Sequence, residues 1–327
     1  KRNERNIMIN YKAGQELDDG LIGLLCKKAF SLFPDKIEKS EQAHTNTVYV
    51  ITLSGGKKVV LKVGPYTDVR LMHHEKNMMY TEVTVLQKMK NYTSIEVPEM
   101  YYYDASNTEF NGEYFFMEYL DGDNLADVRD ALSKPAQAAI DEELGRNNRA
   151  LNDIIGSSFG YYGRLKKRKD NWAEAFRDMM KDAMDDARYH GVQLPRGYDE
   201  DILGQLLEQD KDLFAEVKEP RLVHCDLWDG NVFIKNGRVQ GIIDWERCLW
   251  GDPLMENSFR ADSHNEAFFR GYGQRPFNDN ERVRIKWYTV YRSLIGLTEY
   301  YARGLVDEPA YSRLWHTLSS IMDNFNE

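Results

Sequence analysis

Two short runs of β-branched and aromatic residues stand close together in the first third of the chain. Residues 47–53 and 58–63 are these runs, and Gly55 and Gly56 lie between them. Runs of strand-forming residues on both sides of a glycine-rich turn favour a β-hairpin. The pattern therefore predicts a pair of antiparallel strands in this part of the chain.

A helical pattern and two more extended patterns follow the hairpin. Apolar residues recur at mostly helical spacing from 74 to 90, and Pro98 follows as a stop signal. Residues 101–104 and 113–120 predict two further strands, and the Asp121-Gly turn closes the second of them. The first third of the chain is thus expected to form a small sheet that carries one helix.

Beyond residue 123 the pattern changes to long helical segments. They are expected at about 135–154, 171–190 and 200–217, with two or three more after residue 262. One of these segments carries an apolar stripe, more often core than ligand platform: Trp172, Phe176, Met179 and Met180. Within the helical region, residues 221–226 and 232–244 form a β-rich island with a hairpin turn at Asn236 and Gly237.

The change from strand patterns to helical patterns predicts an α+β protein with two lobes. Residues 1–118 are assigned to a small antiparallel β lobe with one helix, and residues 119–327 to a larger, mostly helical lobe. The hinge between them is expected at about 117–122. A chain of 327 residues is long enough for both lobes. Clefts between lobes commonly bind small molecules, so the function is expected there.

Charge and cysteine content narrow the class of partner. Lys and Arg number 43 and Asp and Glu 53, a formal net charge of −10. An acidic chain argues against nucleic acid as a partner, since that binding relies on an excess of basic residues. The same charge favours cationic small molecules, although it also describes an ordinary solvated surface. Three scattered cysteines and the absence of an apolar stretch of about 20 residues favour a cytoplasmic protein that does not bind membranes.

The densest group of chemistry-bearing side chains lies in the β-rich island. Asp226 and Asn231 stand in one loop, and Asp244 follows across the hairpin. Carboxylate and carboxamide oxygens are ligands suited to Mg²⁺, a hard cation. Asp226 lies between a strand end and a turn, where a carboxylate can accept the proton of a hydroxyl group that attacks a phosphoryl group. The three residues predict a magnesium-dependent phosphoryl-transfer site.

The segment from His224 to Asn231 resembles the HxDxxxxN catalytic loop of the aminoglycoside phosphotransferase family, which has the protein-kinase-like bilobal fold. The resemblance implies that Asp226 is the catalytic base and that His224 orients the loop. It further implies that Asn231 and Asp244 hold Mg²⁺, with ATP or GTP as the phosphate donor. Cys225 departs from the glycine that small-molecule kinases commonly carry there. Because no DFG-to-APE activation segment is found, protein substrates are disfavoured.

A kinase-like fold also needs a lysine on a small-lobe strand and a glutamate on the next helix. Lys62 has apolar neighbours on a predicted strand, where an ammonium group needs a phosphate and a carboxylate as partners. By resemblance to the family's helix, Glu82 is its expected partner. Glu75, expected one step earlier on the same helix, is the alternative.

The loop before the first strand of the hairpin resembles the family's phosphate-binding loop. Thr45, Asn46 and Thr47 lie where protein kinases have a glycine-rich segment. The family is similar in using Ser, Thr and Asn there, so the resemblance implies nucleotide contacts from these three residues.

The segment 115–122 resembles the linker between the two lobes of this family. The resemblance implies that Met117 stands at the back of the adenine pocket. The Glu118 carbonyl and the Leu120 amide are then expected to form the hydrogen-bonding edge that meets the base.

The sequence specifies the acceptor less well. Trp228, in the phrase His-x-Asp-Leu-Trp-x-Gly-Asn, also resembles macrolide phosphotransferases and fructosamine kinases. The expected acceptor is therefore an aminoglycoside-like, macrolide or amino-sugar compound. A series of aspartates either attracts a cationic acceptor or forms a solvated face: Asp178, Asp182, Asp185 and Asp186.

Two alternatives remain open. The first is a choline-type or other metabolite kinase, in which some of the 20 tyrosines would build an aromatic cage for a quaternary ammonium group. The second is a pseudokinase that binds a nucleotide without transferring phosphate. The oligomeric state and the choice between ATP and GTP also stay open.

Overall fold

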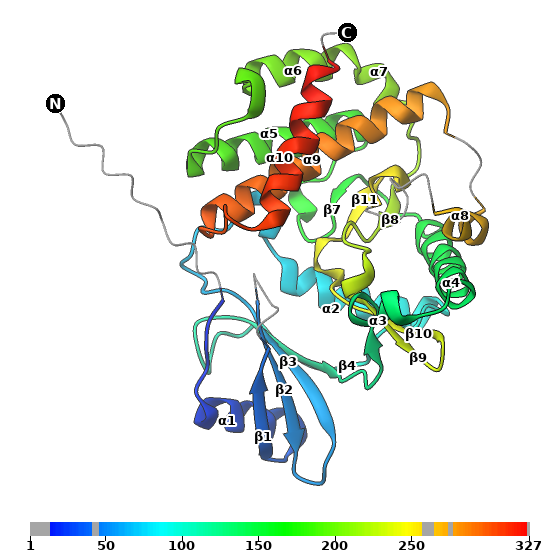
Figure 1. Ribbon diagram of the computed structural model, residues 1–327. Coiled ribbons are helices and arrows are strands. Elements are labelled where there is room, and N and C mark those ends of the chain that lie inside the picture. The colour runs from blue at the N-terminus through cyan, green and yellow to red at the C-terminus, as the bar shows by residue number, and fades with distance from the viewer. Residues whose placement is uncertain (1–13, 41–45, 257–264, 274–276, 326–327) are drawn as a thin grey trace, which may run out of the picture.

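The computed structural model describes residues 14–40, 46–256, 265–273 and 277–325 (Figure 1). Its N-terminal part is a five-stranded antiparallel sheet with the strand order β1-β2-β3-β5-β4. The strands are β1 (Pro34–Lys39), β2 (Thr47–Leu53), β3 (Lys58–Val63), β4 (Met100–Asp104) and β5 (Tyr114–Glu118). The hairpin predicted from the sequence is confirmed as β2 and β3, and Gly55 and Gly56 adopt positive φ angles of 98° and 85° in its turn.

The two faces of this sheet have different neighbours. In β2 every second residue is buried, from Thr47 to Leu53. On this side helix α1 (Asp19–Phe30) packs against residues such as Ile51 and Leu61. The expectation of one helix on the sheet was therefore wrong, because α1 is a second one. Its apolar run is interrupted by Lys27 and Lys28, which lie in the last helical turn, where they interact favourably with the helix dipole.

Helix α2 (Met78–Tyr92) lies between the sheet and the helical part of the chain (Figure 1). It begins later than expected, because Asn77 adopts a left-handed conformation with φ 63°. The residues before it form a separate 3-10 turn, η1 (His73–Glu75). Glu75 and Glu82 are thus not on one helix, which corrects the expectation from the sequence.

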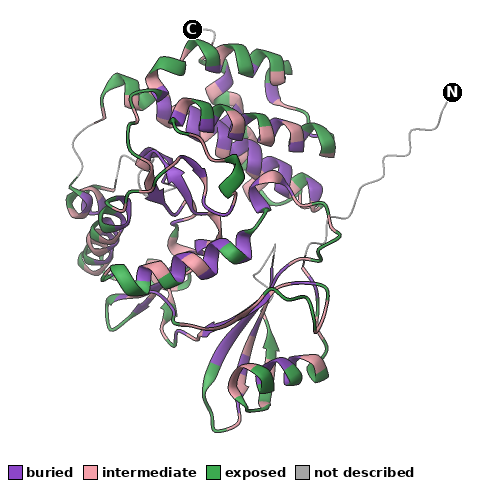
Figure 2. Cartoon of the chain, turned by 180° about the vertical axis from the view of Figure 1, so that it is seen from behind, coloured by how far each residue is buried: buried purple, intermediate pink, exposed green. Residues whose placement is uncertain are grey.

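The remaining helices form the larger part of the molecule. They are α3 (Leu125–Val128), α4 (Lys134–Asn152), α5 (Trp172–His190), α6 (Glu200–Gln209), α7 (Lys211–Phe214), α8 (Glu266–Tyr272), α9 (Asp279–Ala302) and α10 (Pro309–Asp323). The helix expected over 200–217 is divided between α6 and α7. The apolar stripe of α5 is buried and packs with α9 in one core cluster. Figure 2 shows this arrangement as buried residues on inward faces and exposed residues on outward faces.

The β-rich island forms two small sheets inside the helical part. One has the order β10-β9-β6 and the other β7-β11-β8. Their strands are β6 (Asp123–Asn124), β7 (Gly160–Tyr161), β8 (Arg221–Val223), β9 (Val232–Lys235), β10 (Arg238–Ile242) and β11 (Leu249–Gly251). The predicted turn between β9 and β10 is confirmed, with φ angles of 54° at Asn236 and 74° at Gly237. The boundary between lobes at residue 118 stays a prediction. Among the described helices, none has the length and apolar character that crossing a membrane would require.

Gly122, at the end of the predicted hinge, allows a test of how closely the hinge packs against β9 and β10. A Cβ atom added there would overlap with the backbone carbonyl oxygen of Ile234 in β9 and with the side chain of Gln240. Because backbone cannot move aside cheaply, we expect Gly122→Ala to lower the free energy of unfolding by about 1–3 kcal/mol in urea denaturation.

Gly204→Ala is the matched control for this substitution. Gly204 lies on the exposed side of α6, and an added Cβ would meet nothing within 4 Å. Since alanine is the better helix former, this variant should be stabilised by up to about 1 kcal/mol. Equal effects of the two substitutions would contradict the close approach at Gly122.

Candidate active site

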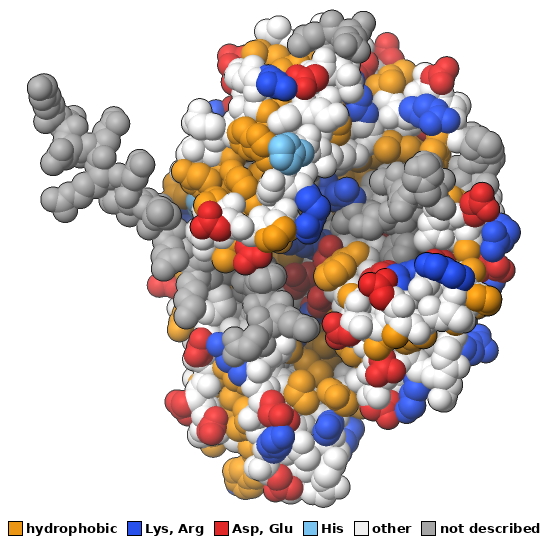
Figure 3. Space-filling model, in the orientation of Figure 1, with side chains coloured by type: hydrophobic (Ala, Val, Ile, Leu, Met, Phe, Trp, Pro, Cys, Tyr) orange, Lys and Arg blue, Asp and Glu red, His pale blue; other side chains and the backbone are white. Residues whose placement is uncertain are grey.

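A cavity of about 640 Å³ lies between the five-stranded sheet and the helical part. The sheet contributes alternate residues on the face that α1 does not cover: Val48, Val50, Val60 and Lys62. Phe233 and Ile243 line the cavity from the β-rich island. The hollow is visible at the centre of Figure 3. Apolar side chains on two opposite sides give the shape that a flat aromatic base requires.

The predicted linker lies along the edge of this cavity. Met117, Glu118 and Leu120 all line it, and Met117 and Leu120 are buried. The valines of β2 and β3 were not predicted as site residues. The two-residue alternation of β2 was the available signal, because Val48 and Val50 must face away from the buried positions beside them.

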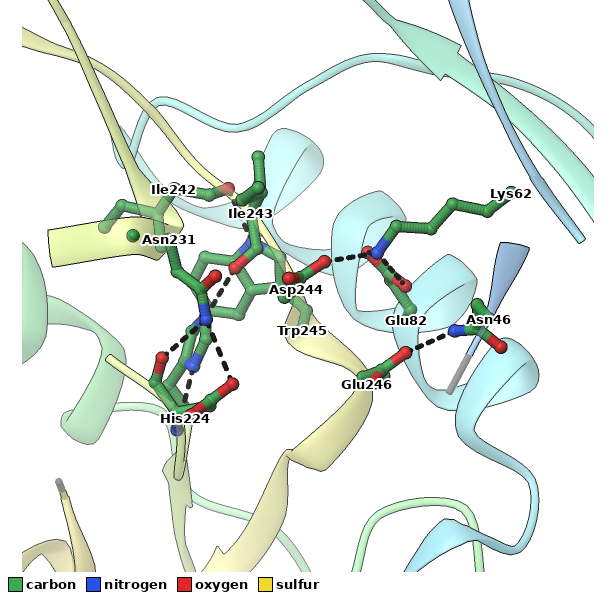
Figure 4. Close-up of polar contacts among 12 residues, drawn as sticks. Asn46, Lys62, Glu82, His224, Asn231, Ile242, Ile243, Asp244, Trp245 and Glu246 are labelled. Atoms are coloured by element: carbon green, nitrogen blue, oxygen red, sulfur yellow. Dashed lines mark hydrogen bonds and ion pairs between the residues drawn. The ribbon is translucent and has the colours of Figure 1, made fainter. Parts of the chain in front are cut away.

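Lys62 connects the sheet, α2 and the β-rich island (Figure 4). Its Nζ donates to both carboxylate oxygens of Glu82, at 2.8 and 2.9 Å, and also to Oδ1 of Asp244. Lys62 is 4% exposed and Glu82 is 0% exposed. Burial opposes the charge on Lys62, but Asp244 and Glu82 outweigh it and raise the pKa of the ammonium group. The lysine is therefore held in its charged form at the wall of the cavity.

The structure pairs Lys62 with Glu82 and places Glu75 in a different ion pair. Glu75 Oε1 accepts from Arg303 at 3.0 Å. The choice depends on the left-handed Asn77, which separates the short turn that carries Glu75 from α2.

Two hydrogen bonds of His224 orient the predicted catalytic loop. Burial lowers the pKa of His224 to about 4, so the ring is neutral near pH 7. Its Nδ1 accepts from the Asp226 backbone N–H at 3.2 Å, which leaves Nε2 to donate to the Ile243 carbonyl at 3.0 Å. The histidine thus links the loop to the strand that leads to Asp244.

Asp226 and Asn231 contact each other inside this loop. Asn231 Nδ2 donates to the Asp226 carbonyl at 2.8 Å and to its carboxylate Oδ2 at 3.0 Å. Burial raises the pKa of Asp226 to about 7, and the positive charge of Arg247 opposes this shift. A carboxylate with a raised pKa is a better proton acceptor than an ordinary aspartate.

Asn231 and Asp244 line the same cavity as Lys62 and offer oxygen donors to it. Since the amide nitrogen of Asn231 donates to Asp226, its Oδ1 is left for another partner. Asp244 uses Oδ1 for Lys62, which leaves Oδ2. A carboxylate and a carboxamide oxygen at the phosphate end of a cavity suit Mg²⁺, so the residues present fit this ion.

Two of the three residues predicted in the phosphate-binding loop are described by the structure, and of these two Asn46 lines the cavity. Its Nδ2 donates to Glu246 Oε2 at 2.6 Å. Thr47 is buried in β2 and is not among the residues that line the cavity. Thr45 lies outside the described residues. Glu246 was missed in the sequence because it joins the site only through the fold.

The backbone conformation of Cys225 explains why small-molecule kinases commonly carry glycine at this position. The residue has φ 65°, in the left-handed region that glycine adopts without the steric clash of a side chain. Its backbone N–H donates to Glu256 Oε1 at 3.0 Å, and the His224 N–H donates to Glu256 Oε2 at 3.2 Å. Glu256 also accepts from Asn148 at 2.8 Å. This buried carboxylate anchors the start of the catalytic loop and was not found from the sequence.

Removing the anchor should loosen the loop. Glu256→Ala leaves two buried backbone N–H groups without this acceptor, so we expect the free energy of unfolding to fall by about 2–4 kcal/mol. Glu256→Gln keeps one acceptor oxygen, so its free energy of unfolding should fall less than that of Glu256→Ala. Urea denaturation of the two variants gives the comparison. If Glu256→Ala is as stable as the parent protein, the anchoring role is wrong.

A second cavity, of about 430 Å³, lies on the other side of Asp226. The two cavities share four lining residues: Asp226, Trp228, Arg247 and Tyr300. Asp226 therefore stands where two bound molecules would meet. The second cavity is lined by aromatic side chains and by residues of α9 and α10, among them Tyr161, Tyr288, Tyr291 and Leu314.

The aspartate series does not line this second cavity. Three of its members line a different cavity, and all four have basic partners. The pairs are Asp178 with Lys169, Asp182 with Arg164, Asp185 with Arg188 and Asp186 with His73. These ion pairs and contacts favour the other interpretation, an ordinary charged face, over a cation-attracting wall for the acceptor.

Comparison with known proteins agrees with this geometry. The model of a family described as the phosphotransferase enzyme family matches residues 37–284. A protein assigned as a fructosamine-3-kinase from Thermobifida fusca YX-ER1 superposes with a TM-score of 0.65 at 18% identity, covering 92% of this chain and 98% of its own. A thermostable variant of aminoglycoside phosphotransferase APH(4)-Ia, in complex with AMP-PNP and hygromycin B, gives 0.63 at 16% identity over 92% and 97% of the two chains.

A third solved structure is the ternary complex of APH(2")-IIa with streptomycin and ATP. It has a TM-score of 0.61 and 16% identity, and covers 94% of this chain and 99% of its own. Comparison with curated protein sequences gives no match. At these identities the solved structures establish the protein-kinase-like fold.

Proposed function

Since this chain belongs to the phosphotransferase enzyme family and is a kinase-type phosphotransferase, we propose that it transfers the γ-phosphate of ATP or GTP to a hydroxyl group of a small molecule. The observation that carries the proposal is the position of Asp226 at the junction of the two cavities. The nucleotide occupies the larger cavity, with its base between the valines of the sheet and Phe233. The acceptor occupies the other.

The proposed reaction is a direct displacement at phosphorus. The acceptor hydroxyl gives its proton to the Asp226 carboxylate while its oxygen bonds to the γ-phosphorus. The bond from the γ-phosphorus to the bridging oxygen breaks, and the nucleoside diphosphate leaves with the electron pair. Lys62, held by Glu82, binds the donor phosphates. Mg²⁺ held by Asn231 and Asp244 would neutralise the negative charge on these phosphates.

The first candidates for the acceptor come from the family resemblance. Aminoglycoside-like, macrolide and amino-sugar compounds are the first candidates, and the solved complexes of two neighbours contain hygromycin B and streptomycin. Choline-type amines are the alternative, because four tyrosines line the acceptor cavity: Tyr161, Tyr288, Tyr291 and Tyr300.

A transfer screen tests the proposed function. Purified protein is incubated with Mg²⁺ and γ-labelled ATP or GTP, together with aminoglycosides, macrolides, amino sugars, choline-like amines and hydroxy acids. Label transferred to any acceptor supports the proposal and selects the nucleotide. A thermal shift with Mg·ATP and no transfer to any member would favour the pseudokinase alternative.

The magnesium requirement gives a separate prediction. Chelation by EDTA should stop transfer, and added Mg²⁺ should restore it. Asp244→Asn keeps an oxygen donor but removes a charge, so we expect it to raise the Mg²⁺ concentration for half-maximal activity by about tenfold or more. Asp201→Asn, on the exposed start of α6, should leave that concentration unchanged. The same Mg²⁺ dependence in both variants would remove Asp244 from the metal site.

A further inference from the structure

The charges around the acceptor cavity differ in sign from the chain as a whole. The protein has a net charge of −10. In contrast, the described residues that line the second cavity include three arginines, Arg247, Arg292 and Arg313, and a single carboxylate, Asp226. A ligand experiences the charges near it more strongly than the overall charge, so the net charge does not describe this cavity.

The three arginines are not equivalent. Arg247 donates to Glu299 Oε1 at 2.7 Å and is shared with the nucleotide cavity. Arg292 and Arg313 line only the acceptor cavity, and neither makes an ion pair or a hydrogen bond within the described part of the chain. Burial lowers the pKa of Arg292, and the negative charge of Asp226 opposes this shift. A half-buried guanidinium group with no carboxylate bound to it favours an anionic partner.

Arg292, which is half-buried, and Arg313, which is exposed, together form the basic wall of the acceptor cavity. Arg292 lies on α9 beside Tyr288, Tyr291 and Gly296, and Arg313 lies on α10. The two helices pack closely where Gly296 meets Leu314. In Figure 3 both basic and acidic side chains lie around the hollow at the centre of this face. Since both arginines stand on packed helices, the basic wall is part of the built site.

We propose that the acceptor of this kinase carries a carboxylate or phosphate group, which Arg292 and Arg313 bind while the acceptor hydroxyl reaches Asp226. The inference rests on the proposed function, because it names the acceptor class of the same site. A cationic acceptor would be repelled by both guanidinium groups, and among the described lining residues it would find a carboxylate at Asp226 alone. The tyrosines and Trp228 enclose the rest of the molecule. An anionic acceptor thus replaces the cationic one expected from the net charge.

Ligands with one sugar skeleton and different charges test this proposal. Glucuronate, glucose 6-phosphate, glucose and glucosamine are titrated by calorimetry into the enzyme with Mg²⁺ and AMP-PNP. We expect at least one of the two anions to bind about tenfold more tightly than glucose and glucosamine, since charge-assisted hydrogen bonds are the stronger ones. A preference for glucuronate or for glucose 6-phosphate separates a carboxylate from a phosphate acceptor.

Two variants connect the preference to the arginines. Arg292→Gln and Arg313→Gln should each reduce the affinity for the anion, by about tenfold for the more buried Arg292, and leave that for glucose unchanged. Arg282→Gln, on the exposed side of the same helix α9, is the matched control and should bind the anion as the parent does. Circular dichroism and nucleotide affinity confirm that each variant is folded.

Several results would overturn the proposal. They are a preference for glucosamine, equal affinity for all four ligands, an anion preference that survives both substitutions, and no anion binding at millimolar concentration. The enzyme could transfer phosphate to an amine, at a rate that is the same in Arg292→Gln. This result would reject the anionic acceptor and would still confirm the kinase activity. Arginine-dependent anion binding without transfer to any acceptor would instead reject the proposed function.

Discussion

Replacing Asp226 by asparagine is expected to reduce phosphate transfer by about 10²–10⁴-fold, because the variant keeps the shape of the side chain but cannot accept the acceptor's proton. The hydrogen bond from Asn231 to the Asp226 backbone carbonyl does not involve the side chain and should persist. Nucleotide affinity should therefore change little. Single-turnover transfer from Mg·ATP measures the first effect and calorimetry with AMP-PNP the second.

Controls separate this effect from a loss of folding. Asp201→Asn, exposed on α6, should retain full transfer. If Asp226→Asn transfers phosphate to its acceptor at the parent rate, Asp226 is not the base. A variant that loses nucleotide binding together with transfer would show instead that the asparagine distorts the loop.

The substitution Lys62→Met should have the largest effect on stability. It leaves Glu82 completely buried without its cation, and removal of one partner from a buried ion pair typically destabilises a protein by about 3–5 kcal/mol. It also removes the ammonium group that faces the donor phosphates, so transfer and nucleotide affinity should both fall. Urea denaturation and calorimetry measure the two effects.

The double variant Lys62→Met with Glu82→Leu separates stability from function. Two apolar side chains of similar size can replace a buried ion pair with little loss of stability. We therefore expect the double variant to be more stable than Lys62→Met and to remain without transfer activity. If the second substitution destabilises the protein further, Glu82 has buried partners other than Lys62. Transfer regained by the double variant would contradict a role of Lys62 in phosphate binding.

The elements that carry the site were largely predictable from the sequence. The hairpin β2–β3 and the turn at Asn236 and Gly237 follow from residues close in the chain, whose conformational preferences act locally. The catalytic loop from His224 to Asn231 is also local, and its spacing pointed to a kinase before any contact was known. Helix α1 was missed, because two lysines interrupt its apolar pattern at the end that the helix dipole favours.

Other residues entered the site only through packing between distant segments. Glu256 reaches the catalytic loop through backbone N–H groups, which carry no sequence signal of their own. Glu82 rather than Glu75 faces Lys62 because one left-handed residue, Asn77, ends the preceding turn. The aspartates of α5 looked available for a cation, but Arg164 and Lys169, which lie outside α5, form ion pairs with Asp182 and Asp178.

By itself, the sequence indicated a kinase-type phosphotransferase, since the expected base, the two expected metal-binding oxygens and the lysine occur at spacings that short-range structure preserves. Only the tertiary structure decided which charged side chains line the proposed acceptor cavity. Arg292 and Arg313 lie on different helices and line one cavity with Asp226 only because the chain folds α9 and α10 against each other. The local charge of a cavity depends on such long-range contacts, and a net charge of −10 does not reveal it.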